Sequence, residues 1–167
     1  MKKKIVQYVV AQDKDGNTRR VRVKELFFRP SVYGVIIKRR KILLAKQWDG
    51  YDFPGGGMEL GESVNETLRR EVWEETGLRV ERGTVVACES SFYIPQFSRG
   101  YFHSILMYFL CRNVRGRISI KNFDGHEKQF ASRAEWVSLT DTKRIKFINS
   151  VDSLEIIRKA IKVRSKS

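Results

Sequence analysis

The sequence predicts a single α+β domain in which helices lie on the faces of a mixed β-sheet. Three observations support this fold class. Turn residues separate many short β-branched runs, one central segment carries helix start and stop signals, and a second stretch of helical periodicity closes the chain. The 167 residues and the 41% hydrophobic content suit one soluble domain of ordinary size. We therefore expect residues 1–167 to form one domain.

The N-terminal part of the chain predicts a β-hairpin over residues 5–27. Two β-branched runs, Ile5–Ala11 and Thr18–Phe27, flank Lys14–Asn17, whose Asp-Gly step is a typical turn signal between strands. Other β-branched and aromatic runs bounded by turn residues predict further strands. These are Ser31–Ile37, Lys41–Gln47, Thr84–Ser91, Tyr101–Arg112 and Glu135–Leu139.

The central helix is expected from about Val64 to Thr76. Ser63 and Glu66 have the spacing of a capping box, which begins a helix, and Gly77 is typical of the residue that follows one. A closing helix is expected over Ser150–Val163, where apolar residues recur at helical spacing.

Glu71, Glu74 and Glu75 form an acidic patch on the central helix, because positions i, i+3 and i+4 are neighbours on a helix surface. The patch borders the apolar stripe that begins at Val64, and Glu62 lies within reach of it. Crowded, half-buried carboxylates repel one another and lose hydration, and a hard cation removes that cost. The patch therefore predicts a Mg²⁺ site, with Mn²⁺ as the alternative. Its place beside the stripe, just after a Gly-rich loop, disfavours an ordinary solvated helix face.

The run from Gly56 to Leu78 reads G-x5-E-x7-R-E-U-x-E-E-x-G-U, with U apolar, and every defined position is filled. It resembles the Nudix box, the signature of hydrolases that act on a nucleoside diphosphate linked to another moiety. The lead-in Tyr51–Gly57 also resembles what precedes the box in that family. The resemblance, which is to MutT-like members, implies a Nudix-type α/β/α sandwich and a Mg²⁺-dependent hydrolase.

The resemblance also implies roles for single residues. Glu71, Glu74 and Glu75 match the positions that hold the metal, with the carbonyl of Gly56 as a further ligand. Arg70 is expected to orient a carboxylate by a bidentate pair. The catalytic residues are thus expected to be Glu74, Glu71 and Arg70, joined by an acid from a loop. The backbone of Gly55, Gly56 and Gly57 is expected to approach the substrate closely.

Two candidates outside the box are less specific. In such enzymes a further acid often comes from a loop before the last strand, so Glu127 is the candidate metal ligand or general base, with Asp124 as its rival. MutT-type members read a purine edge with an Asn near the start of the last helix, and Asn149 lies in a comparable place. The simpler interpretation is that Asn149 or Ser150 caps that helix.

The chain is strongly basic, with 33 Lys and Arg against 19 Asp and Glu and a formal charge of +14. The excess is spread over Lys2–Lys4, Arg19–Arg20, Lys38–Lys41 and Arg158–Lys166. This dispersal favours a general field that steers anions and aids solubility over an RNA-binding surface. The expected partner is a small-molecule nucleotide, RNA is less favoured, and a homodimer is left open.

The expected compartment is the cytoplasm. Met1–Lys4 leads into Ile5–Tyr8 with no secretory apolar region or small-residue cleavage site. The apolar runs are too short to span a bilayer, so no membrane partner is expected.

The favoured hypothesis is a pyrophosphohydrolase that converts nucleoside triphosphates, oxidised ones included, to the monophosphate and pyrophosphate. The first alternative is the same chemistry on an RNA 5′ end or a dinucleoside polyphosphate. The second is a non-catalytic nucleotide- or RNA-binding module, which the intact Arg70–Glu75 segment disfavours.

Overall fold

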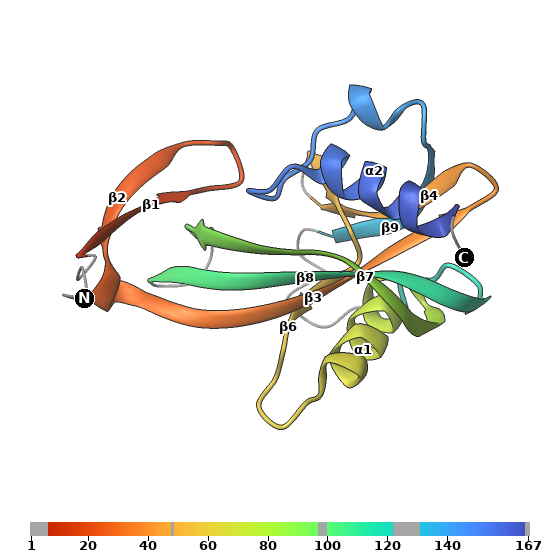
Figure 1. Ribbon diagram of the computed structural model, residues 1–167, viewed down its shortest axis with the longest axis horizontal. Coiled ribbons are helices and arrows are strands. Elements are labelled where there is room, and N and C mark those ends of the chain that lie inside the picture. Colours follow the sequence, from red (N-terminus) through yellow and green to blue (C-terminus); the bar gives the residue numbers. More distant parts are fainter. Residues whose placement is uncertain (1–6, 48, 97–99, 122–130, 166–167) are drawn as a thin grey trace.

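The computed structural model describes residues 7–47, 49–96, 100–121 and 131–165 and confirms a mixed β-sheet with helices on both faces (Figure 1). The strands are β1 (Tyr8–Gln12), β2 (Thr18–Arg22), β3 (Leu26–Lys38), β4 (Lys41–Gln47), β5 (Gly50–Asp52), β6 (Gly55–Gly57), β7 (Leu78–Tyr93), β8 (Tyr101–Gly116) and β9 (Ala131–Ser138). The helices are α1 (Val64–Thr76) and α2 (Ser153–Arg164), with 3-10 turns η1 (Val23–Glu25) and η3 (Thr142–Arg144).

The strand order is β2-β1-β7-β8-β3-β4-β5, with β6 paired to β3 and β9 paired to β4. The sheet is mixed because β8 runs parallel to β3 and antiparallel to β7. Strand β3 is shared by two parts of the sheet: residues 26–35 pair with β8 and residues 36–38 pair with β4. This double pairing explains why β3 begins at Leu26 and not at Ser31 as predicted.

Side chains of β3 alternate between two hydrophobic cores on opposite faces of the sheet. Val32 and Ile36 pack with Leu68 of α1, whereas Val35 packs with Ile156 of α2. In Figure 1, α1 lies below the sheet and α2 lies above it. Helix α1 is therefore fixed to one face of the sheet by a strand that also packs against α2 on the other face.

Helix α1 has the predicted bounds, because its signals are local. Ser63 is the N-cap and exchanges bonds with Glu66 in a capping box, and Gly77 follows in the left-handed conformation with φ 73°. The helix lies close to β3 at Gly34, where a Cβ atom would meet Val72 Cγ2 at 3.0 Å. Among the described residues, no helix is long and apolar enough to cross a membrane.

Three predicted boundaries are wrong, and a distant partner explains one of them. The predicted strand Thr18–Phe27 ends at Arg22, where η1 begins. Strand β7 begins at Leu78 and not Thr84, because its first residues pair with the end of β8 at Gly116. The closing helix begins at Ser153 and not Ser150, because Asp152 is its N-cap.

The N-terminal hairpin has shorter arms than residues 5–27. Strands β1 and β2 pair antiparallel, with Val9 opposite Val21. The Asp13 carboxylate accepts bonds from the backbone N–H groups of Asp15 and Asn17, each at 2.9 Å. A side chain that satisfies turn amides in this way fixes the hairpin register.

The turn between β3 and β4 is strained. Lys38 lies opposite Lys41 in the register, and Arg39 and Arg40 between them have φ values of 47° and 59°. Positive φ at both central positions is the geometry of a type I′ turn, which favours Asn and Gly over arginine. Left-handed backbone costs a non-glycine residue roughly 1–2 kcal/mol, and like charges directly opposite add repulsion.

Replacing the strained arginines with the preferred turn residues should stabilise the fold. We expect Arg39→Asn combined with Arg40→Gly to raise the free energy of unfolding by about 1 kcal/mol, measured by urea denaturation. The matched control is Arg39→Gln with Arg40→Gln, which removes the same two charges and keeps the backbone strain. Equal stabilisation by both pairs would show that charge, and not backbone conformation, limits this turn.

Candidate active site

The candidate active site lies where α1 faces β6 and the segment that joins them. The Arg70 guanidinium donates to both carboxylate oxygens of Glu62, from Nε at 2.6 Å and from Nη2 at 2.9 Å. Its Nη1 donates to Glu71 at 2.9 Å and to Glu74 at 3.0 Å, and Nη2 reaches the Gly57 carbonyl at 3.1 Å. One cation thus contacts three acids of the motif segment, Glu62, Glu71 and Glu74.

Glu62 is fixed from several sides. Its Oε2 accepts from the Glu59 backbone N–H and from the Thr67 hydroxyl, each at 2.9 Å, as well as from Arg70. The hydrogen bonds from Arg70 are the main cause that lowers the pKa of Glu62 to about 2. Glu62 therefore stays ionised and serves Arg70 as a permanent counter-charge.

The three glycines that were predicted as a loop form strand β6. They pair antiparallel with Ser31–Tyr33 of β3, which fixes their backbone beside the helix. At Gly56 a Cβ atom would lie 2.7 Å from both carboxylate oxygens of Glu71. A side chain at this position would displace the Glu71 carboxylate, and the approach of this backbone to a substrate stays a prediction.

Glu71 is a buried carboxyl, only 9% exposed, and both its burial and its charged neighbours affect its pKa. Burial raises its pKa to about 7, although the Arg70 charge and hydrogen bond oppose the shift. The charge of Arg29, on β3, also opposes this rise in pKa. The Arg29 guanidinium lies beside Gly57, where an added Cβ atom would be 2.7 Å from it. Motif spacing gave no sign of Arg29, because strand pairing places it here.

Glu75 points away from Arg70 toward the sheet. Its Oε2 accepts from the Gly55 backbone N–H at 2.9 Å, and its Oε1 accepts from Gln47 Nε2 at 3.2 Å. Gln47 lies on β4 and was not predicted as a site residue. Glu75 therefore links the helix to β4 and β6, the two elements behind the site.

The residues present fit a hard divalent cation by donor type, since Glu71, Glu74, Glu75 and the Gly56 carbonyl all offer oxygen. In the described part of the chain, however, no three carboxylate, His or Cys groups are arranged around one point as a metal site. Arg70 draws Glu71 and Glu74 to itself, whereas Gly55 and Gln47 hold Glu75. Glu74, which is 26% exposed, is the acid with most freedom to rotate.

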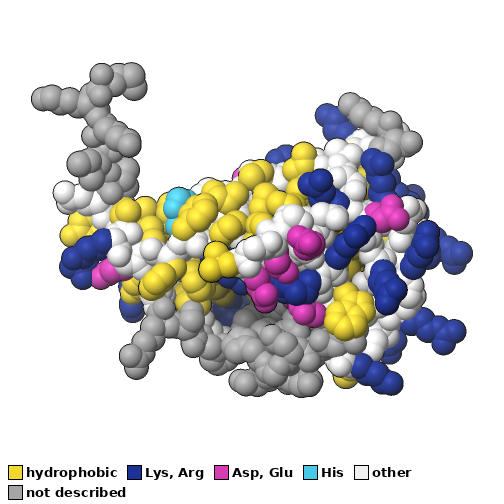
Figure 2. Space-filling view, turned by 90° about the horizontal axis from the view of Figure 1, so that it is seen from below, with side chains coloured by type: hydrophobic (Ala, Val, Ile, Leu, Met, Phe, Trp, Pro, Cys, Tyr) yellow, Lys and Arg dark blue, Asp and Glu magenta, His cyan; other side chains and the backbone are white. Residues whose placement is uncertain are grey.

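A groove of about 720 Å³ runs beside α1 and includes Arg70 and Glu74 in its wall. Arg69, Arg79 and Arg115 also line it, together with Trp73, which is 42% exposed. Figure 2 views the face that carries α1: acidic side chains gather near its middle, basic ones lie to one side, and apolar ones lie to the other.

The apolar side of this face includes aromatic rings of three strands. The His103 ring of β8 lies 5.6 Å from Phe28 of β3 and 4.6 Å from Phe92 of β7, centroid to centroid. Phe28 is 67% exposed. Flat, accessible rings of this kind offer a stacking surface.

Asn149 does not cap the closing helix, and neither does Ser150; that interpretation is wrong, because Asp152 is the N-cap. The Asn149 amide donates to Asp52 Oδ1 at 2.6 Å, and its oxygen accepts from the Ser153 hydroxyl at 2.9 Å. Desolvation raises the pKa of Asp52 to about 7, although the bonds from Asn149 and the Phe53 N–H oppose it. That Asn149 reads a purine edge stays a prediction.

The loop acids Asp124 and Glu127 lie outside the described residues, so the proposed loop ligand or base stays a prediction. Sequence reasoning missed Arg29, Gln47 and Asp52. For Asp52 a signal existed, since an acid between Tyr51 and Phe53 in a short strand is unusual.

Comparisons with known proteins agree with this geometry. The NUDIX domain family model matches residues 27–155. An 8-oxo-dGTP diphosphatase of Buchnera aphidicola subsp. Schizaphis graminum is 32% identical over 122 residues, which cover 70% of this chain and 82% of that protein. Nucleoside diphosphate-linked moiety X motif 6 of Mus musculus is 30% identical over 136 residues, 81% of this chain but 40% of that protein.

Solved structures share the fold. A NUDIX hydrolase from Nitrosomonas europaea superposes with a TM-score of 0.62 over 82% of this chain and 90% of that chain. Sequence identity is 18%, so this likeness bears on the fold alone.

The raised pKa of Asp52 predicts a pH-dependent stability difference. Its pKa is about 7 in the folded protein and about 4 when unfolded, so the folded state holds a proton that the unfolded state releases between these values. The stability that Asp52 contributes should therefore fall as pH rises from 4 to 7, by at most ~1.4 kcal/mol per pH unit.

Asp52→Asn keeps the acceptor oxygen and cannot titrate. In urea unfolding, the free energy of unfolding of this variant relative to that of the wild type should therefore increase from pH 4 to pH 7. Asp141→Asn, at an exposed aspartate, is the matched control and should follow the wild type. Parallel curves for wild type and Asp52→Asn would contradict the assignment.

Proposed function

The chain belongs to the NUDIX domain family, and from this membership we propose that it hydrolyses nucleoside triphosphates, oxidised ones included, between the α- and β-phosphates. Members of this family hydrolyse pyrophosphate bonds and generally use a divalent metal ion. The reaction consumes one water and releases the nucleoside monophosphate, pyrophosphate and a proton. The name of the Buchnera relative, an 8-oxo-dGTP diphosphatase, supports including oxidised substrates.

The observation that carries the proposal is the contact of Arg70 with three carboxylates directly beside glycine backbone. A phosphate chain is highly anionic, so an acidic site accepts it only together with a cation. The acids would hold that cation, and β6 would let phosphate oxygens approach because glycine has no side chain to intervene. Arg70 keeps Glu62 and Glu71 in place while Glu74 turns toward the reacting groups.

Glu71, Glu74, Glu75 and the Gly56 carbonyl would hold the ion, with Glu127 as the proposed loop ligand or base. Oxygen-only donors favour Mg²⁺, with Mn²⁺ as the alternative. When bound, the ion supplies positive charge to phosphate oxygens and makes a bound water more acidic. Gly55–Gly57 line the path of the phosphate chain.

The base is placed on the aromatic surface of β3, β7 and β8. Phe28, Phe92 and His103 lie on strands that also border the acidic site, and their rings offer stacking without selecting one base. We assign selectivity for the base to polar groups, and Asn149 is the residue predicted to hydrogen-bond to the base edge. The Asp52 contact supports a fixed orientation of that amide.

An RNA 5′ end is the second candidate substrate, and the groove beside α1 favours it. In the described part of the chain, Arg69, Arg79 and Arg115 have no ion pair with a carboxylate, whereas Glu81 in the same groove accepts a bond from Asn113 at 2.6 Å. Unpaired arginines beside an accessible indole suit a strand of phosphates and bases. The groove meets the active site at Glu74, so a strand would enter it there.

Glu74→Gln should abolish most turnover and leave the fold intact. The amide keeps an acceptor for Arg70 but loses the charge that holds a cation, so we expect a rate loss of about a hundredfold or more in Mg²⁺-dependent pyrophosphate release. Thermal unfolding should change little, because this carboxylate is partly exposed.

The matched control for this experiment is Glu66→Gln on the same helix. Glutamine also completes a capping box, so Glu66→Gln should keep both stability and turnover. Full Mg²⁺-dependent activity in Glu74→Gln would refute the site assignment.

Arg79→Glu combined with Arg115→Glu should separate the two substrates. The rate of hydrolysis of triphosphorylated RNA should fall at least tenfold, while the rate with single nucleotides should not change, because only an RNA strand is long enough to extend along the groove. RNA turnover at limiting substrate should also fall steeply with added salt in the wild type.

The control is Arg144→Glu with Lys162→Glu, an equal charge reversal at η3 and α2. If both double variants reduce RNA turnover alike, overall charge and not the groove governs it. RNA activity that ignores salt and both variants would remove RNA as a substrate.

A further inference from the structure

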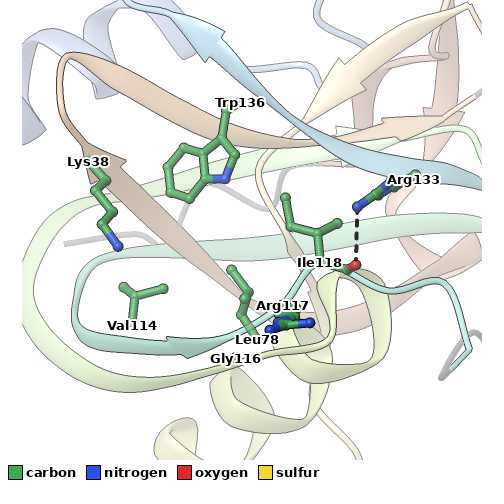
Figure 3. Close-up of a pocket in the computed structure, with 8 residues that line it drawn as sticks. All are labelled: Lys38, Leu78, Val114, Gly116, Arg117, Ile118, Arg133 and Trp136. Carbon is green, nitrogen blue, oxygen red and sulfur yellow. Dashed lines mark hydrogen bonds between the residues drawn. The ribbon is translucent and has the colours of Figure 1, made fainter.

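A second pocket lies beyond the C-terminal end of α1 and shares no residue with the acidic site. It has a volume of about 400 Å³ and is formed by the ends of β3 and β8, the segment after β8, and β9. Figure 3 shows Lys38 and Arg133 reaching in from opposite sides, with Trp136 above and Leu78 and Val114 below. Its volume lies in the range of small-molecule sites.

The lining of this pocket is basic. Lys38, Arg117 and Arg133 line it, and no carboxylate does so among the residues that the structure describes. Neither Lys38 nor Arg117 pairs with a described acid, and Arg133 has only a 3.4 Å bond to the Ile118 carbonyl. The neighbouring acid, Glu135, points to the other face of β9 and pairs with Lys46 at 3.6 Å. Three cations around one hollow repel one another unless an anion enters.

The pocket also has a flat, apolar part. Trp136 is half-buried against the core beneath α1, as are Val114 and Ile118. The Trp136 indole N–H makes no hydrogen bond to any described residue, so it offers a further donor beside a stacking face. An inorganic anion alone would leave this apolar lining in contact with water.

The floor of the pocket is rigid because it is fastened to α1. The Ser119 N–H donates to the Thr76 carbonyl at 3.0 Å, and a Cβ at Gly77 would lie 2.9 Å from the Arg117 carbonyl. Leu78, which lines the pocket, is the second residue after the helix and is buried. A site held this firmly needs little rearrangement before it binds a ligand.

The β3–β4 turn adds a second, independent observation. Lys38, which lines the pocket, lies opposite Lys41 at the start of this turn, and Arg39 and Arg40 between them are in left-handed conformations. Such a turn is unfavourable for stability, and strain of this kind is typical of functional positions.

We propose that Lys38, Arg117, Arg133 and Trp136 form a second binding site for a nucleotide, separate from the catalytic acids. Arg117 and Lys38 bind the phosphate, and the base stacks on Trp136 above the apolar floor. Because this site uses arginine and lysine and not a metal ion, its nucleotide binding does not require Mg²⁺. The acidic site, by contrast, repels phosphate when no cation is present.

The test is binding of AMP to the full chain in EDTA at low salt, followed by calorimetry and tryptophan fluorescence. We expect AMP to bind and to change the fluorescence, and Lys38→Glu combined with Arg117→Glu to weaken binding at least tenfold. Trp136→Phe should abolish the fluorescence change while calorimetry still detects binding. Far-ultraviolet circular dichroism checks that each variant is folded.

Arg144→Glu with Lys162→Glu is the matched charge control and should bind AMP as the wild type does. The proposal is overturned if millimolar AMP does not bind in EDTA, or if the Lys38/Arg117 variant binds it unchanged. Inorganic phosphate that binds as tightly as AMP would overturn the role given to Trp136.

Discussion

The alternation of side chains along β3 is the constraint on which the rest of the structure depends. Successive residues of this strand enter opposite cores, so α1 and α2 are both positioned by the same backbone. The strand also pairs with β8, β4 and β6. Through β6 it sets the glycine backbone against Glu71, and through Arg29 it adds a charge to the site. The active site is therefore an outcome of sheet register as much as of the helix motif.

The positive charge of Arg70 offsets the repulsion among the crowded carboxylates. Glu62, Glu71 and Glu74 would repel one another if left alone, and burial already raises the pKa of Glu71 to about 7. The Arg70 guanidinium can pair with all three carboxylates because it presents several N–H donors in one plane and always keeps its positive charge. Glu75 is held by different partners, and Glu74 is the most exposed of the three acids that Arg70 contacts.

The positive charge is more organised in three dimensions than along the chain. Basic residues that are dispersed in the sequence meet in two places, the groove beside α1 and the pocket beyond its end. In each place an indole accompanies the cations. The sequence alone does not show this arrangement, because Arg79 and Arg115 are brought together by the pairing of β7 with β8.

The sequence by itself determined the family motif, the mixed α+β class and the bounds of α1, since capping, helical spacing and motif spacing depend on residues a few positions apart. Tertiary structure alone decided the length of β3 and the contact of Asn149 with Asp52. That contact joins residues 97 positions apart. Strand pairing and burial depend on partners far along the chain, and no local pattern specifies which partner a buried polar group will find.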